Sequence, residues 1–401
     1  MTEKKLTPAM QQYYDMKAEF PDAILFFRMG DFYEMFDDDA HIAHKVLWIN
    51  ITSRNKNALN PQPLAGIPYH AKDKYLPQLV NAWYKVAIAE QVSDSKAKWI
   101  VQREIIRVIT PATLNLEWDN YVQEKSSNFI VSIVSDDSWY WISLLDPSSW
   151  EWKTWEVDIF DKLINILYKV WVTEVILSKK LFWNQELKEI LAKKFNLNIF
   201  YFEEYKDSYE KLKNHFWVKN LVWFNLENKK LAISAANLVL DYLKSIQKTD
   251  LWYLSKLSFE TFSDNLDLDE STIKSLDLLY NFSTNSSKIW TLLWVLDKTN
   301  TAMWKRFLRE AIVSPLQDID AINNRLDIID EFLKDSILLD KVNNELKQIA
   351  DLDNILTRLA LWRANPRDLL NMKRSLQAVL DVYKIILESW NKRLINLLKL
   401  K

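Results

Sequence analysis

Short apolar runs alternate with amphipathic segments over the first 118 residues, a pattern that predicts a compact mixed α/β domain. The apolar run 23–29 suits a buried strand, and it ends at Gly30 and Asp31, two residues that favour a turn. Thr7 followed by Pro8 is typical of a helix start. Helices are expected at 9–19, 38–47 and 70–82, and further strands at 49–53, 84–92 and 100–109.

The pattern restarts after the polar stretch 123–128. Strands interleaved with helices beyond it indicate a second α/β domain. From about Leu268 the strand signal largely stops and helical periodicity dominates. Strands are expected at 129–134, 140–145, near 156, at 174–177 and at 197–202, and helices at 159–170, 185–195, 230–247, 276–280, 303–312, 319–333, 338–349 and 369–387.

These patterns predict a fold class of α/β plus all-α, with domains at residues 1–122, 123–250 and 251–401. The final residues, 397–401, continue a helical pattern without a capping residue. We therefore expect the chain to be truncated there.

Glycine is almost missing from the chain, which has 2 glycines and 19 tryptophans in 401 residues. Ordinary usage of about 7% would give nearly thirty glycines. Several tryptophans stand in polar, turn-like surroundings, as Trp83, Trp183 and Trp390 do, where a residue that tolerates positive φ is wanted. Our hypothesis is that most of them are UGA codons that the organism reads as glycine. Trp152 and Trp252 are the candidates for genuine tryptophans.

Charge and composition narrow the functional classes. The 52 basic and 54 acidic residues give a net charge of −2, so DNA binding would have to be local and not driven by a global field. The chain has no cysteine and only 4 histidines, which argues against disulfides and a zinc site. No stretch approaches the roughly 20 apolar residues of a membrane span, and the N-terminus does not resemble a signal sequence. We expect a cytosolic protein with no membrane partner.

Several motifs carry a resemblance to one family. The segment 27–36, FRMGDFYEMF, resembles the signature of the mismatch-binding domain of the MutS family, and similarity continues through AGIPYH at 65–70, VAIAEQ at 86–91 and REIIRVITP at 103–111. The segments 296–309 and 363–369 resemble signatures of that family's core domain. Where the chain has Trp48, Trp83, Trp99, Trp223, Trp304 and Trp362, the family pattern has or readily accepts glycine.

The resemblance implies a mixed α/β mismatch-binding domain, a ribonuclease-H-like α/β connector domain and the start of a helical core and lever region. It implies that Phe32 is a wedge that enters the minor groove and stacks on a mispaired base, and that Glu34 hydrogen-bonds that base. A strand-anchored segment would place these two side chains on one side while Tyr33 packs back. Unstacking costs less at a mismatch than at a normal step, so deformability would provide the discrimination.

Other residues are weaker candidates for DNA contacts. Arg28 lies within the first motif, Arg54, Asn55 and Lys56 follow a predicted strand, and Tyr69 and His70 belong to the second motif. For each, a solvated or core position is as compatible with the sequence as a contact. Lys96, Lys98 and Arg103 are weaker still.

The resemblance also implies partners and cofactors that lie largely outside this chain. Mismatched double-stranded DNA would be the ligand, a MutL-type protein the partner, and the bacterial nucleoid the location. Full-length members are ATP-switched homodimers that use ATP and Mg²⁺, but no segment here could bind ATP phosphates, so we expect neither cofactor nor ATPase activity in this fragment, and it could be a monomer.

Two alternatives remain open at this stage. Asp136, Asp137, Asp146 and Glu151 form an acidic group in the second domain that could serve a metal-dependent nuclease if the carboxylates converge. Turn residues between strands are the simpler interpretation. A MutS relative that acts in recombination is the other alternative, and the wedge motif argues against it.

Overall fold

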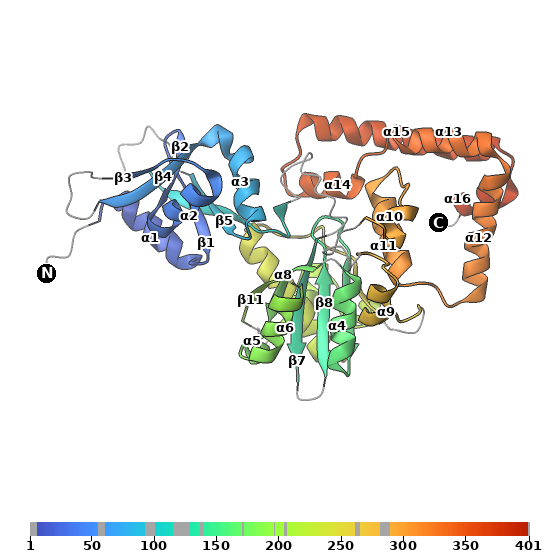
Figure 1. Ribbon diagram of the computed structural model, residues 1–401, viewed down its shortest axis with the longest axis horizontal. Helices are drawn as coiled ribbons and strands as arrows, with labels where there is room; N and C mark the ends of the chain where they lie inside the picture. Colours follow the sequence, from blue (N-terminus) through green and yellow to red (C-terminus); the bar gives the residue numbers. More distant parts are fainter. Residues whose placement is uncertain are drawn as a thin grey trace. The chain divides into compact units, whose positions relative to one another are not determined.

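The computed structural model describes residues 6–54, 61–92, 101–114, 128–136, 139–170, 172–195, 197–203, 207–260, 265–280 and 289–399. The chain divides into two compact units (Figure 1). Unit 1 comprises residues 1–114 and 240–251, and unit 2 comprises residues 115–239 and 252–401. Each unit has its own six-stranded sheet.

Unit 1 is built on a sheet with the strand order β3-β4-β2-β1-β5-β6, in which only β1 and β5 are parallel. Phe26 and Phe27 on β1 point to opposite faces and are both fully buried, so both faces are covered at the centre of the sheet. The elements are α1 (Pro8–Glu19), β1 (Ala23–Met29), β2 (Phe32–Phe36), α2 (Asp37–Leu47), β3 (Ile51–Arg54), β4 (Gln62–Pro68), η1 (Tyr69–Ala71), α3 (Lys72–Asn81), β5 (Lys85–Gln91) and β6 (Arg103–Ile109).

The predicted elements of unit 1 are present, and the structure adds β2 and β4. The sequence indicated only an anchored segment after the turn, whereas Phe32 pairs with Met29 in a β-hairpin that continues to Glu34 opposite Phe27. The two-residue turn makes this possible because Gly30 adopts a φ of 59°. β4 escaped prediction because it contains Pro63, Gly66 and Pro68, which are depleted in strands.

A buried carboxylate joins the first two helices of unit 1 to the sheet. Asp39 on α2 accepts hydrogen bonds from the Tyr13 hydroxyl at 3.1 Å and the Leu25 amide at 2.9 Å, and pairs with the Lys17 ammonium at 2.8 Å. Burial and the charge of Asp39 raise the pKa of Tyr13 well above its ordinary value, so its hydroxyl remains a donor. The network ties α1, α2 and β1 together.

Removing this carboxylate should destabilise unit 1. Asp39→Ala leaves a buried amide, a hydroxyl and an ammonium without their shared acceptor, so the free energy of unfolding should fall by about 3 kcal/mol. Chemical denaturation measures the change. Asp38→Ala is the control, since Asp38 has the same charge and lies exposed in the same helical turn, and equal losses in the two variants would contradict the assignment.

Unit 2 begins with a mixed sheet of order β11-β10-β7-β8-β9-β12. β7, β8 and β9 form an antiparallel meander, while β10 and β11 extend the sheet in parallel and β12 runs parallel to β9. The elements are β7 (Phe129–Ser135), β8 (Tyr140–Leu145), β9 (Trp152–Val157), α4 (Phe160–Lys169), β10 (Val172–Leu177), α5 (Lys179–Phe182), α6 (Gln185–Phe195), β11 (Asn198–Tyr201), α7 (Ser208–Phe216), η3 (Val222–Phe224), α8 (Lys230–Gln247) and β12 (Leu257–Phe259). Residues 240–247 of α8 are counted with unit 1.

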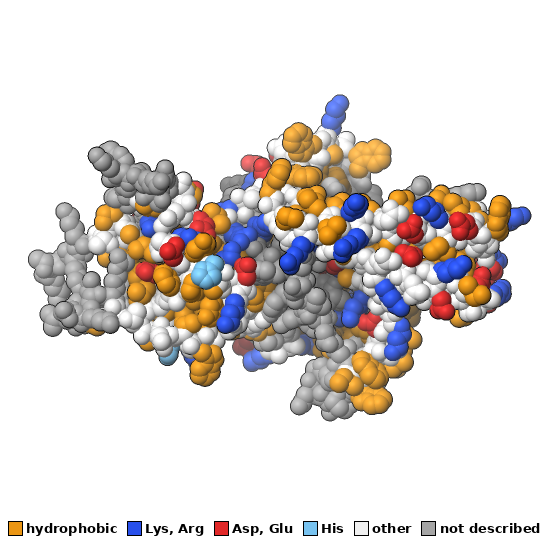
Figure 2. Space-filling model, turned by 90° about the horizontal axis from the view of Figure 1, so that it is seen from above, with side chains coloured by type: hydrophobic (Ala, Val, Ile, Leu, Met, Phe, Trp, Pro, Cys, Tyr) orange, Lys and Arg blue, Asp and Glu red, His pale blue; other side chains and the backbone are white. Residues whose placement is uncertain are grey.

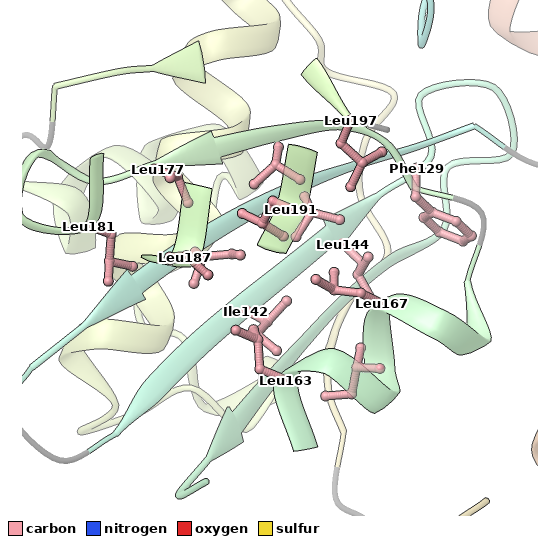
Figure 3. Close-up of a cluster of buried hydrophobic side chains, with 14 of the residues drawn as sticks. Phe129, Ile142, Leu144, Leu163, Leu167, Leu177, Leu181, Leu187, Leu191 and Leu197 are labelled. Atoms are coloured by element: carbon pink, nitrogen blue, oxygen red, sulfur yellow. The ribbon is translucent and has the colours of Figure 1, made fainter. Parts of the chain in front are cut away.

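A leucine-rich core covers one face of this sheet. Leu163 and Leu167 of α4 and Leu187 and Leu191 of α6 pack toward Ile142 and other strand residues (Figure 3). The Ser132 hydroxyl on β7 donates to the Ala235 carbonyl of α8 at 2.6 Å, so α8 lies against β7. Strands of the sheet are therefore buried by helices, as the interleaved sequence pattern predicted.

The last third of the chain, which belongs to unit 2, is helical, and this confirms the predicted fold class. The predicted helix at 276–280 is wrong, because α9 stops at Ser275 and Asp277 takes a left-handed φ of 45°. Leu278 and Leu279 are buried in the turn that follows, and this produced the misleading periodicity. The helices are α9 (Glu270–Ser275), α10 (Leu292–Leu296), α11 (Ala302–Val313), α12 (Ile319–Lys334), α13 (Ser336–Leu346), α14 (Leu352–Ala360), α15 (Pro366–Glu388) and α16 (Lys392–Lys399).

The motif at 363–369 forms the start of α15. Asn365 and Asp368 form a reciprocal capping box, and Pro366 occupies the first helical position. The buried Asp368 carboxylate also pairs with Arg358 at 2.7 Å. Seen from above, the helical region has exposed apolar side chains among charged ones (Figure 2).

Many tryptophans occupy backbone positions that suit glycine. Among the described residues, twelve non-glycine residues have positive φ, and seven of these are tryptophan. Trp48 and Trp217 end helices in the left-handed conformation, which is where glycine is normally found. Five of the seven are more than 70% exposed, namely Trp48, Trp217, Trp290, Trp362 and Trp390. This geometry favours the hypothesis that these codons are read as glycine.

The two candidates for genuine tryptophan differ in their surroundings. Trp152 is 1% exposed and its indole N–H donates to the Ser143 hydroxyl at 2.8 Å. Trp252 lies 65% exposed. The packing of Trp152 therefore uses an indole, while that of Trp252 does not.

Candidate nucleic-acid interface

The β1–β2 hairpin presents an aromatic ring and a carboxylate on one face of the unit 1 sheet. Phe32 is 47% exposed, Tyr33 is buried and Glu34 is half-buried, which matches the alternation expected from the sequence. Gly66 on β4 is the cross-strand partner of Glu34. Because Gly66 has no side chain, nothing projects from the sheet at this position beside Glu34. This front face of the hairpin, with Phe32 and Glu34, is the candidate contact surface.

The opposite face of the hairpin is held by a cluster of polar and aromatic side chains. The Tyr33 hydroxyl donates to Glu90 of β5, and the guanidinium of Arg28 lies 3.8 Å from the same carboxylate. The guanidinium also stacks on the ring of Tyr69, 3.8 Å from its centroid, and its Nε donates to the carbonyl of Gly30. Arg28, a predicted DNA contact, is thus partly buried and contacts Glu90, Tyr69 and Gly30.

Burial and the neighbouring carboxylate of Glu90 raise the pKa of Tyr33 above its ordinary value, while the nearby charge of Arg28 lowers it in part. Tyr33 therefore stays protonated at neutral pH and keeps its hydrogen bond. Glu90 belongs to the motif VAIAEQ at 86–91, and the sequence pattern indicates no role for it. Its partner Tyr33 on β2 comes close only through the pairing of strands that are distant in the sequence. The sequence pattern does not show such pairing.

The second predicted contact segment lies beside the hairpin. Phe32 pairs with Pro68 at the end of β4, and the amide of Tyr69 donates to the Asp31 carbonyl at 2.9 Å. Tyr69 and His70 are both exposed and meet edge to face at 5.7 Å. The structure therefore brings Tyr69 and His70 close to Phe32.

Arg54 is not brought to the same place. It ends β3 and pairs with Gln62, at the other end of β4 from Pro68, so about 20 Å of strand separates the two positions. Asn55 and Lys56 lie outside the described residues, as do Lys96 and Lys98.

Arg103, a weaker candidate, has a structural role. Its Nε donates to the Arg28 carbonyl at 2.6 Å and its guanidinium covers the Phe27 ring at 4.8 Å. Burial lowers the pKa of Arg103, and the negative charge of Glu34 raises it in part. The carboxylate of Glu34 therefore has a basic group near it on the front face.

The acidic group of unit 2 does not converge. Asp146 is fully buried and accepts from the Ser148 amide and hydroxyl at 2.8 and 2.6 Å, and Asp136 accepts from the Trp139 amide, as turn residues do. Glu151 pairs with Lys153. Asp137 lies outside the described residues, and within the described part of the chain no three acidic or histidine side chains are grouped to hold a metal ion.

The protein is modular, with two sheet domains followed by a helical region. Its candidate contact surface is small and consists of the hairpin face with Phe32 and Glu34 in the first domain. Three family models match the chain: MutS domain I over residues 7–117, MutS domain II over residues 128–258 and MutS domain III over residues 271–398. The chain belongs to the MutS family. None of the helices in the described part of the chain is long and apolar enough to cross a membrane.

Curated relatives agree with this assignment. The chain is 37% identical over 391 residues to the DNA mismatch repair protein MutS of Streptococcus mutans, and 97% of the chain and 44% of the relative are covered. It is 38% identical over 398 residues to the protein of the same name from Streptococcus pyogenes serotype M4, with 99% and 44% covered. The chain thus spans less than half the length of these relatives.

Proposed function

We propose that this chain recognises mismatched base pairs in double-stranded DNA as part of DNA mismatch repair. The observation that carries the proposal is the exposed Phe32 ring beside Glu34 on a hairpin of domain I. Phe32 acts as a wedge that inserts between base pairs, and Glu34 hydrogen-bonds the base edge left without a partner. The relatives that share the chain's sequence are named as mismatch repair proteins, which supports the same function.

Selectivity in this proposal comes from the DNA. Opening a normal base step costs a few kcal/mol, and a mismatched step has already lost part of its pairing and stacking energy. An aromatic ring gains about 1–3 kcal/mol by stacking on a base, so insertion becomes favourable first where the step is weak. The net charge of −2 fits this view, because binding then depends on a local contact.

Glu34 adds a chemical test of the base. A carboxylate near DNA is repelled by phosphates, so its presence is useful only if it meets a base N–H, or a base acceptor after protonation. In a paired base the donors and acceptors of the pairing edge are occupied by the partner base, whereas a mispaired base leaves some of them available. Arg103 limits the electrostatic cost because its positive charge acts on Glu34 from the same face.

The remaining activities belong to the longer family protein. We propose that it is an ATP-switched clamp that uses ATP and Mg²⁺ in a part beyond this chain. We further propose that it forms homodimers, recruits a MutL-type protein and acts at the bacterial nucleoid. We also propose that Tyr69 and His70 add DNA contacts and that Arg54, Asn55 and Lys56 add phosphate contacts.

Competition binding tests the proposed function. The chain is titrated with a duplex that contains one G·T mismatch and with the matched duplex of otherwise identical sequence, at one fixed salt concentration. We expect the Kd for the mismatched duplex to be at least about tenfold lower, a difference of about 1.4 kcal/mol. Equal Kd values for the two duplexes would contradict the proposal.

A further inference from the structure

We propose that Glu90 is a positioning residue for mismatch discrimination: from the back of the hairpin, it holds the strand that presents Phe32 and Glu34. The proposal rests on the proposed function and deepens it. Glu90 lies on β5, on the face opposite to Phe32, and is not expected to touch DNA.

Both oxygens of the Glu90 carboxylate are directed at the hairpin. Oε1 accepts the hydrogen bond from Tyr33, the residue between Phe32 and Glu34. Oε2 lies 3.8 Å from the Arg28 guanidinium, which comes from the other strand of the same hairpin. One side chain on β5 therefore fixes both β1 and β2.

Arg28 extends this hold to the turn that precedes Phe32. Its Nε donates to the Gly30 carbonyl, and its guanidinium lies against the Tyr69 ring. The Tyr69 amide in turn donates to the Asp31 carbonyl at 2.9 Å. The carbonyl groups of both turn residues, Gly30 and Asp31, therefore accept hydrogen bonds from Arg28 and Tyr69.

The mechanical consequence follows from where the wedge stands. Phe32 is the first residue of β2 and lies next to a two-residue turn. When its ring is inserted into a base step, the opposing force acts on this turn. If the hairpin yields, the ring retreats and the base step stays closed, whether or not it is mismatched. A rigid hairpin converts the difference in DNA stiffness into a difference in binding.

Two variants each remove one of the interactions between Glu90 and the hairpin while nearly keeping the shape of the side chain. Glu90→Gln removes the charge that Arg28 faces, and Tyr33→Phe removes the hydroxyl that donates to Glu90. Each should lower the ratio of matched to mismatched Kd by about tenfold and change the Kd for matched duplex by less than about twofold. The double variant should lose little more than either single variant, because the two groups act as one unit.

Glu104→Gln is the matched control. Glu104 is exposed on β6, opposite Glu90 in the strand pairing, and its substitution changes the net charge by the same amount. This variant should keep the Kd ratio of the unmodified chain. A loss equal to that of Glu90→Gln would show that charge alone is responsible and would overturn the proposal.

The failures of the two proposals can be told apart. If Phe32→Ala abolishes discrimination while Glu90→Gln and Tyr33→Phe retain it, Glu90 has no positioning role and the function stands. If Phe32→Ala leaves discrimination unchanged, the wedge assignment fails and the positioning role of Glu90 fails with it, and if the unmodified chain binds both duplexes equally, the proposed function itself fails. Should Glu90→Gln not fold, Tyr33→Phe decides, since its ring preserves the packing, and an unchanged ratio in that variant overturns the proposal.

Discussion

Phe32→Ala should abolish the preference of this chain for mismatched over matched duplex. The substitution removes the exposed ring that would stack on a base, a contribution of about 1–3 kcal/mol, and so should lower discrimination by roughly tenfold to a hundredfold. Affinity for matched duplex should change little, because phosphate contacts dominate binding that does not depend on sequence. Competition titrations at one salt concentration measure both quantities.

Ile106→Ala provides the control for that experiment. Ile106 is an exposed apolar residue on β6 of the same unit, so its loss removes a similar apolar surface away from the hairpin. It should leave the Kd ratio unchanged. If Ile106→Ala and Phe32→Ala reduce discrimination equally, the wedge assignment is wrong.

Glycine at the left-handed tryptophans should stabilise the protein. A non-glycine residue in the left-handed conformation costs about 1 kcal/mol or more, and glycine removes this cost. The five exposed residues Trp48, Trp217, Trp290, Trp362 and Trp390 are the sites for replacement. They are far apart in sequence, and if their effects add, the combined variant should gain several kcal/mol in the free energy of unfolding.

Two control variants separate backbone strain from loss of an exposed indole. Trp223 is also highly exposed but lacks positive φ, so Trp223→Gly should bring no gain. Trp152→Gly should cost about 3–5 kcal/mol because its buried ring fills the core. A gain confined to the left-handed sites supports the hypothesis, and no gain there counts against it.

Peptide mass spectrometry of the protein isolated from its own organism tests the codon reading directly. We expect glycine at Trp48, Trp83 and Trp304, and tryptophan at Trp152. An indole mass at the first three positions would overturn the recoding hypothesis while leaving the family assignment intact.

The sequence predicted most of the fold because its elements carry strong local patterns. The apolar run of β1 and the periodic helices α11, α12 and α15 could be located without the structure. β2 and β4 could not, because their pairing depends on a turn and on a proline-containing strand that meet only in the folded chain. The buried turn at 276–280 imitated a helix because apolar spacing alone does not distinguish the two.

The candidate site was predictable on its front and not on its back. Alternation along 32–34 predicted that Phe32 and Glu34 share one side while Tyr33 packs back, and the structure has Tyr33 buried between the more exposed Phe32 and Glu34. The packing of the Arg28 guanidinium on the Tyr69 ring and its approach to Glu90 could not be predicted. Such contacts between strands distant in sequence have no local signal.

Photocrosslinking from position 32 shows whether the Phe32 side chain reaches the mispaired base. Phe32 is replaced by p-azidophenylalanine, and the chain is irradiated with a duplex that carries one G·T mismatch at a known position; the same substitution at Ile106 serves as the control. Position 32 should crosslink to the mispaired base or its immediate neighbour, and position 106 should not. Crosslinks from position 32 spread evenly along the duplex, or equal yields with matched DNA, would contradict the wedge assignment.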